Sequence, residues 1–473
     1  REAIKYVRHS LYRRGIEGSK VMMFDELERY IAYGSVADDK SSVPAVDKIV
    51  LDTVCRAIRE ELLYFEAIAD KEGFTDDMYR FIRTCKRQYI ASEDLLSIID
   101  QIEDSILQAK LKDIYNIYSA YEEELQRRNI YSMDDIGTTA LCNTLESPYL
   151  DNVDTIIIDG FTDIDPIDMN IIKKIAARED VNLYVNIPCL NPLMCRFVDR
   201  VLVEPLASMG FSIEDDEHSI EYFNTPIARL VSTLYTGRQV CVDANSISIK
   251  RYPCVRSEIR ETAKDIEQRL EEGESAYNMA VYMDDREEYS REILSVFKEF
   301  DIPIELNYSL PISSSALARE LIAVVRETDV QYMHWAQWLN LMEDYLLHRE
   351  EICCQDEEEL DSYGILNAEA WKNIDKQLRL LRSSIDSRHI SNSLTGKEDF
   401  LKYFKKWIST STVHIEYGEK SGVRILGTDL AIGQRYRHIY ILGMNDGIIP
   451  NLPSDIDMLT RQERNILMGM GLN

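Results

Sequence analysis

The pattern of apolar positions alternates between helical and strand character along the chain. Between residues 46 and 128 the apolar residues recur at spacings of three and four, and no β pattern interrupts them. Residues 111–128, LKDIYNIYSAYEEELQRR, form one apolar face made by Leu111, Ile114, Tyr115, Tyr118, Tyr121 and Leu125. This part of the chain is therefore predicted to be a helical block.

A strand–helix–strand pattern follows the helical block. Residues 153–161, VDTIIIDGF, form a continuous β-branched run of the kind seen in strands that are buried on both faces. A helix is predicted over residues 166–178, with Asp165 as its cap, and VNLYVNIP supplies a second strand. Strand, helix and strand in this order predict a right-handed βαβ unit in a parallel sheet. Upstream, residues 19–33 predict a short buried strand and then a helix capped by Asp25.

A second α/β pattern begins with SISIKRYP at residue 246. It continues through a predicted helix over 257–272, the strand NMAVYM, a helix over 286–300 and the strand DIPIEL. Residues 312–412 turn helical again and contain all four tryptophans, before GVRILGTDLAIG and HIYILGM return to strand character. The second helical block thus interrupts its α/β partner. Such insertions occur where the chain ends lie close together on a domain surface.

Charge and cysteine content narrow the function classes. The chain has 54 Lys and Arg against 83 Asp and Glu, a net charge of -29, which opposes binding to nucleic acid or an anionic membrane unless a local basic surface exists. No apolar run reaches the roughly 18 residues that a bilayer span requires, so no membrane association is expected. The nine cysteines show no CxxC pair and no zinc-like spacing, which indicates reduced thiols in a cytoplasmic protein.

Motifs for catalysis are sparse. The phosphate-binding pattern GxxxxGK[ST] does not occur, and none of the seven histidines lies in a metalloprotease or nucleophile-elbow setting. Asp159 ends the strand TIIID, where parallel sheets often present a carboxylate to a ligand such as Mg²⁺. The alternative is that Asp159 and Gly160 only end a strand and begin a turn. We expect no catalytic residue and no metal site from these patterns.

Two quoted stretches carry a family resemblance. Residues 153–175, VDTIIIDGFTDIDPIDMNIIKKI, and the preceding KLKDIYNIYSAYEEELQRRNIYSMDDI closely resemble AddB-type subunits of bacterial AddAB helicase–nucleases, within the UvrD-like superfamily 1 helicase lineage. The order of segments agrees from near Val21 to Asn473. The resemblance implies an α/β fold with two RecA-like parallel-sheet domains, each with a mainly helical accessory domain. The first implied RecA-like domain consists of residues 1–33 and 131–245, and residues 34–130 form its helical accessory domain. The second consists of residues 246–311 and 413–473, and residues 312–412 form its helical accessory domain.

The helicase motifs that the resemblance places in this chain have lost polar residues. Asp159 and Gly160 stand at motif II, where active relatives carry an Asp–Glu pair, so the position of the general base is empty. Asp284 stands about where active relatives carry an arginine after the motif IV strand. An acid cannot stabilise the charge that develops on a transferred phosphate. The resemblance thus implies vestigial chemistry at both positions.

Motif V corresponds to the start of residues 427–450, GTDLAIGQRYRHIYILGMNDGIIP. Ala431, Gly433 and Tyr436 fit the pattern of active helicases, whereas the departures fall on positions that would contact DNA or nucleotide. The residues assigned to this degenerate motif are Gly427, Asp429, Ile432, Gly433 and Arg435. We interpret it as a retained scaffold without ATPase chemistry. ILGMNDGIIP is therefore expected to end a core strand and to shape a surface turn.

The implied function is that of an inactive helicase-like core. Such a core would bind and guide DNA, as a single strand or a duplex end, during processing of double-strand breaks for recombinational repair, while an AddA-type subunit drives translocation. In this family the helicase-like region can also scan single-stranded DNA for a recognition octamer. Arg435, Arg437 and His438 are the candidate DNA contacts, because they follow the motif V loop. The alternative is that they are ordinary surface charges.

The cofactors of the family are implied only for a full-length complex. ATP, magnesium and an iron–sulfur cluster would belong to a phosphate-loop region, a partner and a nuclease domain that lie outside these residues, so this sequence is expected to be a piece of a longer protein. No cofactor is expected in the chain itself. Two other functions stay open: a protein–protein scaffold without DNA contacts, and an active UvrD-like helicase in the full-length protein.

Overall fold

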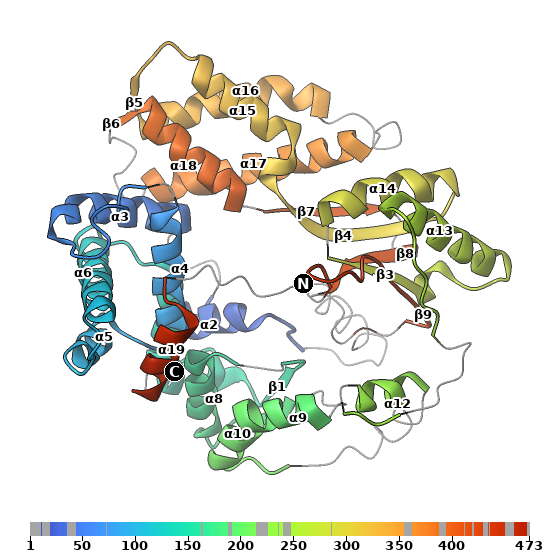
Figure 1. Cartoon of the computed structure of the whole chain (residues 1–473), viewed down its shortest axis with the longest axis horizontal. Helices are drawn as coiled ribbons and strands as arrows, with labels where there is room; N and C mark the ends of the chain where they lie inside the picture. The colour runs from blue at the N-terminus through green and yellow to red at the C-terminus, as the bar shows by residue number, and fades with distance from the viewer. Residues whose placement is uncertain are drawn as a thin grey trace.

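Two helical blocks and two α/β units are arranged around the centre of the molecule (Figure 1). The first helical block lies at the left of this view, the second at the top, and the two parallel sheets at the right and the bottom. The expected α/β class with parallel sheets is confirmed. The structure, a computed structural model, describes residues 11, 19–35, 44–71, 73–161, 164–187, 192–213, 226–234, 236–239, 247–284, 286–353, 362–386, 394–410, 412–418, 421–428, 434, 436–449 and 458–470.

The first helical block confirms the periodicity of residues 46–128. Its helices are α3 (Pro44–Ala57), α4 (Phe74–Arg87), α5 (Ser92–Ile99) and α6 (Ser105–Arg127). Helix α6 begins where the Asp104 carboxylate accepts hydrogen bonds from the backbone N–H groups of Ile106 and Leu107. The apolar stripe predicted for α6 is buried, with the exception of the half-buried Tyr115. Helical spacing was therefore sufficient to identify which face of α6 enters the core.

Helix α2 (Phe24–Tyr33) begins differently from the prediction. Residues 19–23 form no strand and none of them is buried, so the predicted short buried strand near Val21 is wrong. Asp25 does not cap the helix; its carboxylate pairs with Arg29 at 2.8 Å, within the helix. The backbone N–H of Met23 donates instead to the Glu26 carboxylate at 3.1 Å. Glu26 lies one residue further along the helix, so its side chain can reach back to the backbone N–H of Met23. Asp25 is too close to Met23 to do the same.

The first sheet consists, in the described chain, of β1 (Thr155–Asp159) and β2 (Asn182–Asn186), which are parallel. Between them runs α8 (Pro166–Ala176), with Pro166 in its first turn as predicted. Asp165 occupies the N-cap position as predicted, but its side chain makes no capping hydrogen bond and accepts instead from Arg87 at 2.7 Å. The prediction that strand β1 is buried on both faces is also wrong. Ile158 is buried, but Ile157 is 68% and Tyr184 is 56% exposed, because the helices α2, α7 (Ile136–Asn143) and α8 pack on one face only.

Shorter helical segments complete the first half of the chain. None of the described helices is long and apolar enough to pass through a membrane. The short segments are η2 (Arg59–Glu61), η3 (Met133–Asp135), η4 (Thr144–Glu146), η5 (Leu150–Asn152), α9 (Pro192–Val198), the π turn η6 (Asp199–Val203), α10 (Glu204–Ser208) and α12 (Pro226–Thr233).

The second sheet has five described strands in the order β7-β4-β8-β3-β9. The parallel strands are β4 (Ile304–Pro311), β8 (Val423–Gly427), β3 (Met279–Met283) and β9 (His438–Ile441), while β7 (Thr412–Gly418) runs antiparallel to β4. Helices α13 (Val255–Glu271) and α14 (Arg286–Glu299) match the predictions to within two residues at each end. The predicted pattern at residue 246 is not a strand: residues 247–253 are described without a sheet partner.

The second helical block leaves and re-enters the sheet at one point. Its helices are α15 (Ala316–Glu327), α16 (Trp335–Cys353), α17 (Ser362–Asp386) and α18 (Lys397–Thr410), with a small hairpin of β5 (Tyr332–His334) and β6 (Leu394–Gly396). Pro311 at the end of β4 and Thr412 at the start of β7 are cross-strand partners. The two ends of the insertion are therefore adjacent, as insertion into a folded unit requires.

Buried polar contacts join the two helical blocks. Asp52 of α3 is 3% exposed, and its carboxylate accepts from Thr75 at 3.0 Å and from Tyr403 of α18. Arg56, one turn after Asp52, lies 3.4 Å from Asp399 of α18. The C-terminal helix α19 (Arg461–Gly469) also reaches the first block, where Glu463 pairs with Lys110 of α6 at 3.0 Å. One apolar core runs through these elements and the second sheet.

Arg87 joins the first helical block to the first α/β unit. Its guanidinium donates to Glu28 of α2 at 2.9 Å, to Asp168 of α8 at 2.8 Å and to Asp165 at 2.7 Å. The side chains of Glu28 and Asp168 are only 5% and 8% exposed. Such buried carboxylates are stable as ions only while a cation and hydrogen bonds compensate them. Arg87 supplies that compensation for both.

The stability of the Arg87 cluster is expected to fall as pH rises. Burial, followed by the adjacent Glu28 carboxylate, raises the pKa of Asp168 to about 8. The folded chain therefore binds this proton more tightly than the unfolded chain, and the stabilisation is lost between about pH 4 and pH 8. Asp168→Asn, whose amide donates to Glu28 permanently, should flatten this part of the pH dependence. Urea unfolding at pH 5 and pH 8 measures the difference, and identical pH dependences of the two proteins would contradict the assignment.

Candidate functional site

Asp159 lies where the sequence predicted it, at the carboxyl end of a parallel strand. It is in register with Asn186 of β2, whose side-chain amide donates to the Asp159 Oδ1 at 2.5 Å. Gly160 follows with φ of 84°. A glutamate in that left-handed conformation would be strained, which explains why the chain turns here at glycine. One oxygen of the Asp159 carboxylate is thus engaged by a neighbouring strand, and the next residue shapes a turn.

The carboxyl edge of the second sheet holds another engaged carboxylate. Gly427 ends β8 beside Met283 of β3, which places Asp284 and Thr428 next to each other. The Thr428 hydroxyl donates a short hydrogen bond to the Asp284 carboxylate. Asp284 therefore links two central strands at the position where the resemblance implies an arginine in active helicases. This contact ties the end of β3 to the end of β8.

The turn after β9 is held by two residues that sequence reasoning missed. The backbone N–H of Gly443 donates to Glu258 of α13 at 3.0 Å, and the Tyr289 hydroxyl of α14 donates to the other oxygen of Glu258 at 2.6 Å. Gly443 has φ of 71°, and a Cβ there would lie 3.2 Å from the Tyr289 hydroxyl. Gly443 and Glu258 are separated by 185 residues, so no local signal could have paired them.

Strand β9 was predicted to be a core strand, but it is an edge strand of the described sheet. Ile439 and Ile441 are 51% and 47% exposed, because β9 has a partner on one side only, β3, in the described sheet. The expected surface turn is present, with Asn445 donating its backbone N–H to the Gly443 carbonyl at 2.7 Å. ILGMNDGIIP therefore ends an edge strand and turns over α13 and α14.

Arg437 and His438 lie at the opposite edge of the second sheet. His438 begins β9 beside Met279, at the amino end of β3, whereas ligands of open parallel sheets bind at the carboxyl ends. Glu274 pairs with Arg437 at 2.8 Å and lies 3.4 Å from the His438 Nε2. Hydrogen bonds, first from Asn278 and then from His438, lower the pKa of Glu274 and keep it ionised. The positive charge of this edge is therefore balanced locally.

The neighbouring contacts also fix the His438 tautomer. Its Nδ1 lies 3.1 Å from the Arg269 guanidinium, which can only donate, so Nδ1 is the acceptor and Nε2 carries the hydrogen. Arg269 is in turn held by Asp265 at 2.9 Å, and Tyr440 donates to the same carboxylate at 2.6 Å. Burial opposes ionisation of Asp265, but the bonds from Tyr440 and Arg269 outweigh it and lower the pKa of Asp265.

The rest of the motif V prediction lies outside the described residues. Those positions are Asp429, Ile432, Gly433 and Arg435. Within the described ranges, no three His, Cys, Asp or Glu side chains are grouped so that they could hold a metal ion.

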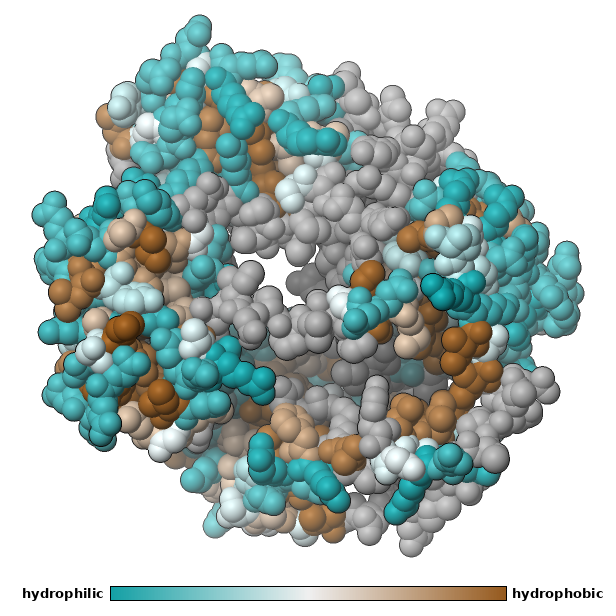
Figure 2. All heavy atoms as spheres, viewed as in Figure 1, coloured by the Kyte–Doolittle hydropathy of each residue, from teal (hydrophilic) through white to brown (hydrophobic). Residues whose placement is uncertain are grey.

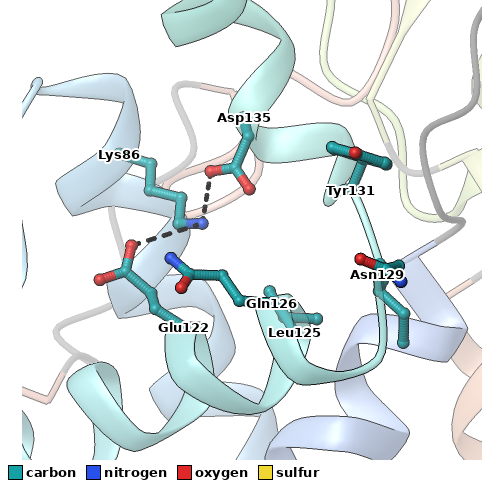
Figure 3. A pocket seen from close by; sticks show the side chains of 8 residues that line it. Lys86, Glu122, Leu125, Gln126, Asn129, Tyr131 and Asp135 are labelled. Atoms are coloured by element: carbon teal, nitrogen blue, oxygen red, sulfur yellow. Dashed lines mark hydrogen bonds and ion pairs between the residues drawn. The ribbon is translucent and has the colours of Figure 1, made fainter.

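A polar pocket of about 280 Å³ lies at the end of α6, away from the sheet edges (Figure 3). Lys86 of α4 points into it, with its Nζ 2.5 Å from Asp135 and 3.9 Å from Glu122. Burial, although opposed by Lys86, raises the pKa of Glu122. The charges of the pocket compensate one another, and it contains no nucleophile beside a base. Its full lining is Lys86, Glu122, Leu125, Gln126, Asn129, Ile130, Tyr131 and Asp135.

Comparison with known proteins shows which family the chain resembles. Residues 12–190 match the family model described as ADDB, N-terminal. The B-type subunit of the ATP-dependent helicase/deoxyribonuclease of Caldanaerobacter subterraneus subsp. tengcongensis is 22% identical over 73% of this chain and 32% of its own length. The proteins of the same name from Clostridioides difficile and Clostridium novyi are 26% and 21% identical, over 58% and 100% of this chain. These matches cover 20% and 50% of the two relatives, so the chain spans half or less of each relative. The chain is therefore similar to AddB-type subunits, and the family model matches less than half of its length.

Proposed function

We propose that this chain is the inactive helicase-like core of an AddB-type subunit in a cytoplasmic helicase–nuclease that processes double-strand DNA breaks for recombinational repair. The chain binds and guides DNA, as a single strand or a duplex end, while an AddA-type subunit drives translocation. Scanning of the single strand for a recognition sequence would take place along the same path. ATP, magnesium and an iron–sulfur cluster belong to the full-length complex in this proposal.

The proposal rests on the hydrogen bonds that the carboxylates at the sheet edges accept from other segments of the chain. Metal-dependent hydrolysis needs carboxylate oxygens directed at the metal and at an attacking water. Here Asp159 accepts from Asn186, Asp284 accepts from Thr428, and Glu258 accepts from Gly443 and Tyr289. Each of these carboxylates thus ties separate segments of the chain together. The arrangement supports a scaffold that keeps the helicase shape without its chemistry.

Titration of single-stranded DNA tests the proposal directly. A fluorescein-labelled oligonucleotide is titrated with the chain at low and at physiological salt, and anisotropy reports binding. Binding that weakens steeply with salt would support phosphate contacts, despite the net charge of -29. Arg437→Ala should make the slope of log K against log salt shallower by roughly 0.7, the value for one phosphate contact. Arg319→Ala, an exposed arginine of α15, is the matched control.

The absence of binding at either salt concentration would contradict the DNA-guiding role. It would favour the second candidate, a scaffold whose acidic surface binds a partner protein, which the net charge and the paired state of Arg437 already support. The active-helicase alternative requires DNA-stimulated ATP turnover by the full-length protein without its partner.

Neutralising Glu274 is expected to strengthen DNA binding. In Glu274→Gln the guanidinium of Arg437, 71% exposed, loses its ionic partner and becomes available to a phosphate. Binding should become tighter at each salt concentration, because Arg437 no longer has to leave the Glu274 carboxylate before it contacts a phosphate. The same anisotropy titration measures it, with Glu146→Gln, an exposed glutamate elsewhere on the surface, as the control for overall charge. Equal effects of the two variants would show that Arg437 does not contact DNA.

A further inference from the structure

The loop between α3 and α4 presents an apolar surface on the first helical block. Leu63, Tyr64 and Ile68 are 68%, 45% and 44% exposed, which is unusual for three large apolar side chains in one short segment. Leu62, Phe65 and Ala69 alternate with them and are buried. The buried residues anchor the segment, called the 59–70 loop below, and direct its other side chains into solvent. Figure 2 shows apolar surface on this block, at the left of the view, within a polar surround.

A buried carboxylate holds the 59–70 loop in this conformation. Asp113 of α6 is fully buried and accepts the backbone N–H groups of Leu63, Tyr64 and Phe65 at 2.9, 2.7 and 2.9 Å. Three consecutive donors compensate a carboxylate that would otherwise be costly to bury. Arg59 closes the loop by donating to the Glu66 carbonyl at 2.9 Å and to Asp70 at 3.0 Å. The exposed side chains are therefore presented on a fixed backbone, which lowers the entropy lost when a partner binds.

The rim of the 59–70 loop is acidic. Glu60, Glu61 and Glu66 are exposed, and none is in an ion pair with a described residue. Among the described residues, three cations lie near the apolar side chains. Lys110 has its Nζ 5.5 Å from the Tyr64 ring centroid, while Arg59 and Lys71 both pair with Asp70. Lys110 is already paired with Glu463 and is 8% exposed, so it does not offset the rim. An acidic rim repels DNA phosphates and anionic lipid headgroups.

We propose that the 59–70 loop is a docking site for a basic amphipathic helix of another protein. The apolar side chains Leu63, Tyr64 and Ile68 contact the apolar face of that helix, and its Lys and Arg side chains pair with the three rim glutamates. The preformed loop and the unpaired charge both favour this occupant. The site is independent of the DNA contacts proposed above.

The test uses a labelled model peptide and the whole chain. The peptide has about 18 residues, with leucine at helical spacing and lysine elsewhere, and anisotropy reports its binding at physiological salt. Leu63→Ser/Ile68→Ser should weaken binding about tenfold or more, as expected for central interface anchors. Leu347→Ser, which removes a leucine that is 61% exposed on α16, should leave it unchanged. A peptide with glutamate in place of lysine should not bind.

A second set of variants tests the charge of the rim. Glu60→Gln/Glu61→Gln/Glu66→Gln should weaken peptide binding and reduce its salt dependence. Neutralising Glu123, Glu146 and Glu271, three exposed glutamates elsewhere, should have little effect. Equal losses in the loop and control variants would overturn the proposal, because they would indicate only non-specific attraction to an acidic protein. Dimerisation of the chain that Leu63→Ser abolishes would overturn it in favour of a second copy as the occupant.

Discussion

Replacing Arg87 by methionine is expected to lower the free energy of unfolding by about 3–5 kcal/mol, the cost of breaking a buried ion pair by removing one partner. Methionine fills much of the same volume but donates no hydrogen bond. Glu28 and Asp168, with side chains 5% and 8% exposed, would then share a site without a cation. Asp165 would also lose its guanidinium contact, but it is 43% exposed and can be hydrated instead.

The matched control for Arg87 is an arginine on the surface of the same helical block. Arg127 is 69% exposed and pairs with Glu124 at 2.6 Å. Arg127→Met should cost far less than Arg87→Met, because water and salt screen an exposed ion pair. Urea unfolding followed by circular dichroism compares the two variants. Above the pKa of Asp168, which burial raises to about 8, adding Asp168→Asn to Arg87→Met should recover part of the loss, because it removes the second buried negative charge. If Arg87→Met were no more destabilising than Arg127→Met, the cluster would not contribute to the joint between α4, α2 and α8.

Gly418→Ala is expected to destabilise the second α/β unit by roughly 2–5 kcal/mol. Gly418 ends β7 with φ of 95°, and a Cβ there would lie 2.0 Å from the backbone carbonyl oxygen of Ile304 in β4. Overpacking of this kind costs roughly 1–3 kcal/mol, and the left-handed conformation costs an L-residue roughly 1–2 kcal/mol more. The clash involves backbone, so it cannot be relieved by rotating a side chain.

Gly273→Ala separates the two contributions. Gly273 has φ of 91° but nothing within 4 Å of its Cβ position, so only the conformational cost of roughly 1–2 kcal/mol applies. The difference between the two variants in urea unfolding therefore measures the steric overlap between β7 and β4. A Gly418→Ala protein as stable as Gly273→Ala would show that β4 and β7 separate easily at this end.

Local sequence patterns predicted the position of Asp159 in the candidate site but not its hydrogen-bond partner. The apolar run ending in Asp159 predicted a carboxylate at the end of a parallel strand, and the structure confirms that position. The partner of that carboxylate, Asn186, lies at the end of the next strand and was not predicted, because only the register of β1 and β2 brings the two residues together. Arg437 was predicted as a DNA contact from its place after motif V. The pairing of Arg437 with Glu274 depends on the packing of distant segments. The DNA contact of Arg437 therefore stays a prediction, and it requires Arg437 to leave the Glu274 carboxylate.

The sequence by itself determined the elements whose signals are local. Helical spacing identifies the buried face of α6, Pro166 marks the start of α8, and apolar runs mark β1, β3 and β8, because backbone hydrogen bonds and side-chain periodicity depend on neighbours in the chain. Tertiary structure alone decided the face of β1 that is covered, the strand order of the second sheet and the partners of Arg87, Glu258 and Asp113. These depend on which distant segments pack together, and burial and charge compensation are set only by that packing.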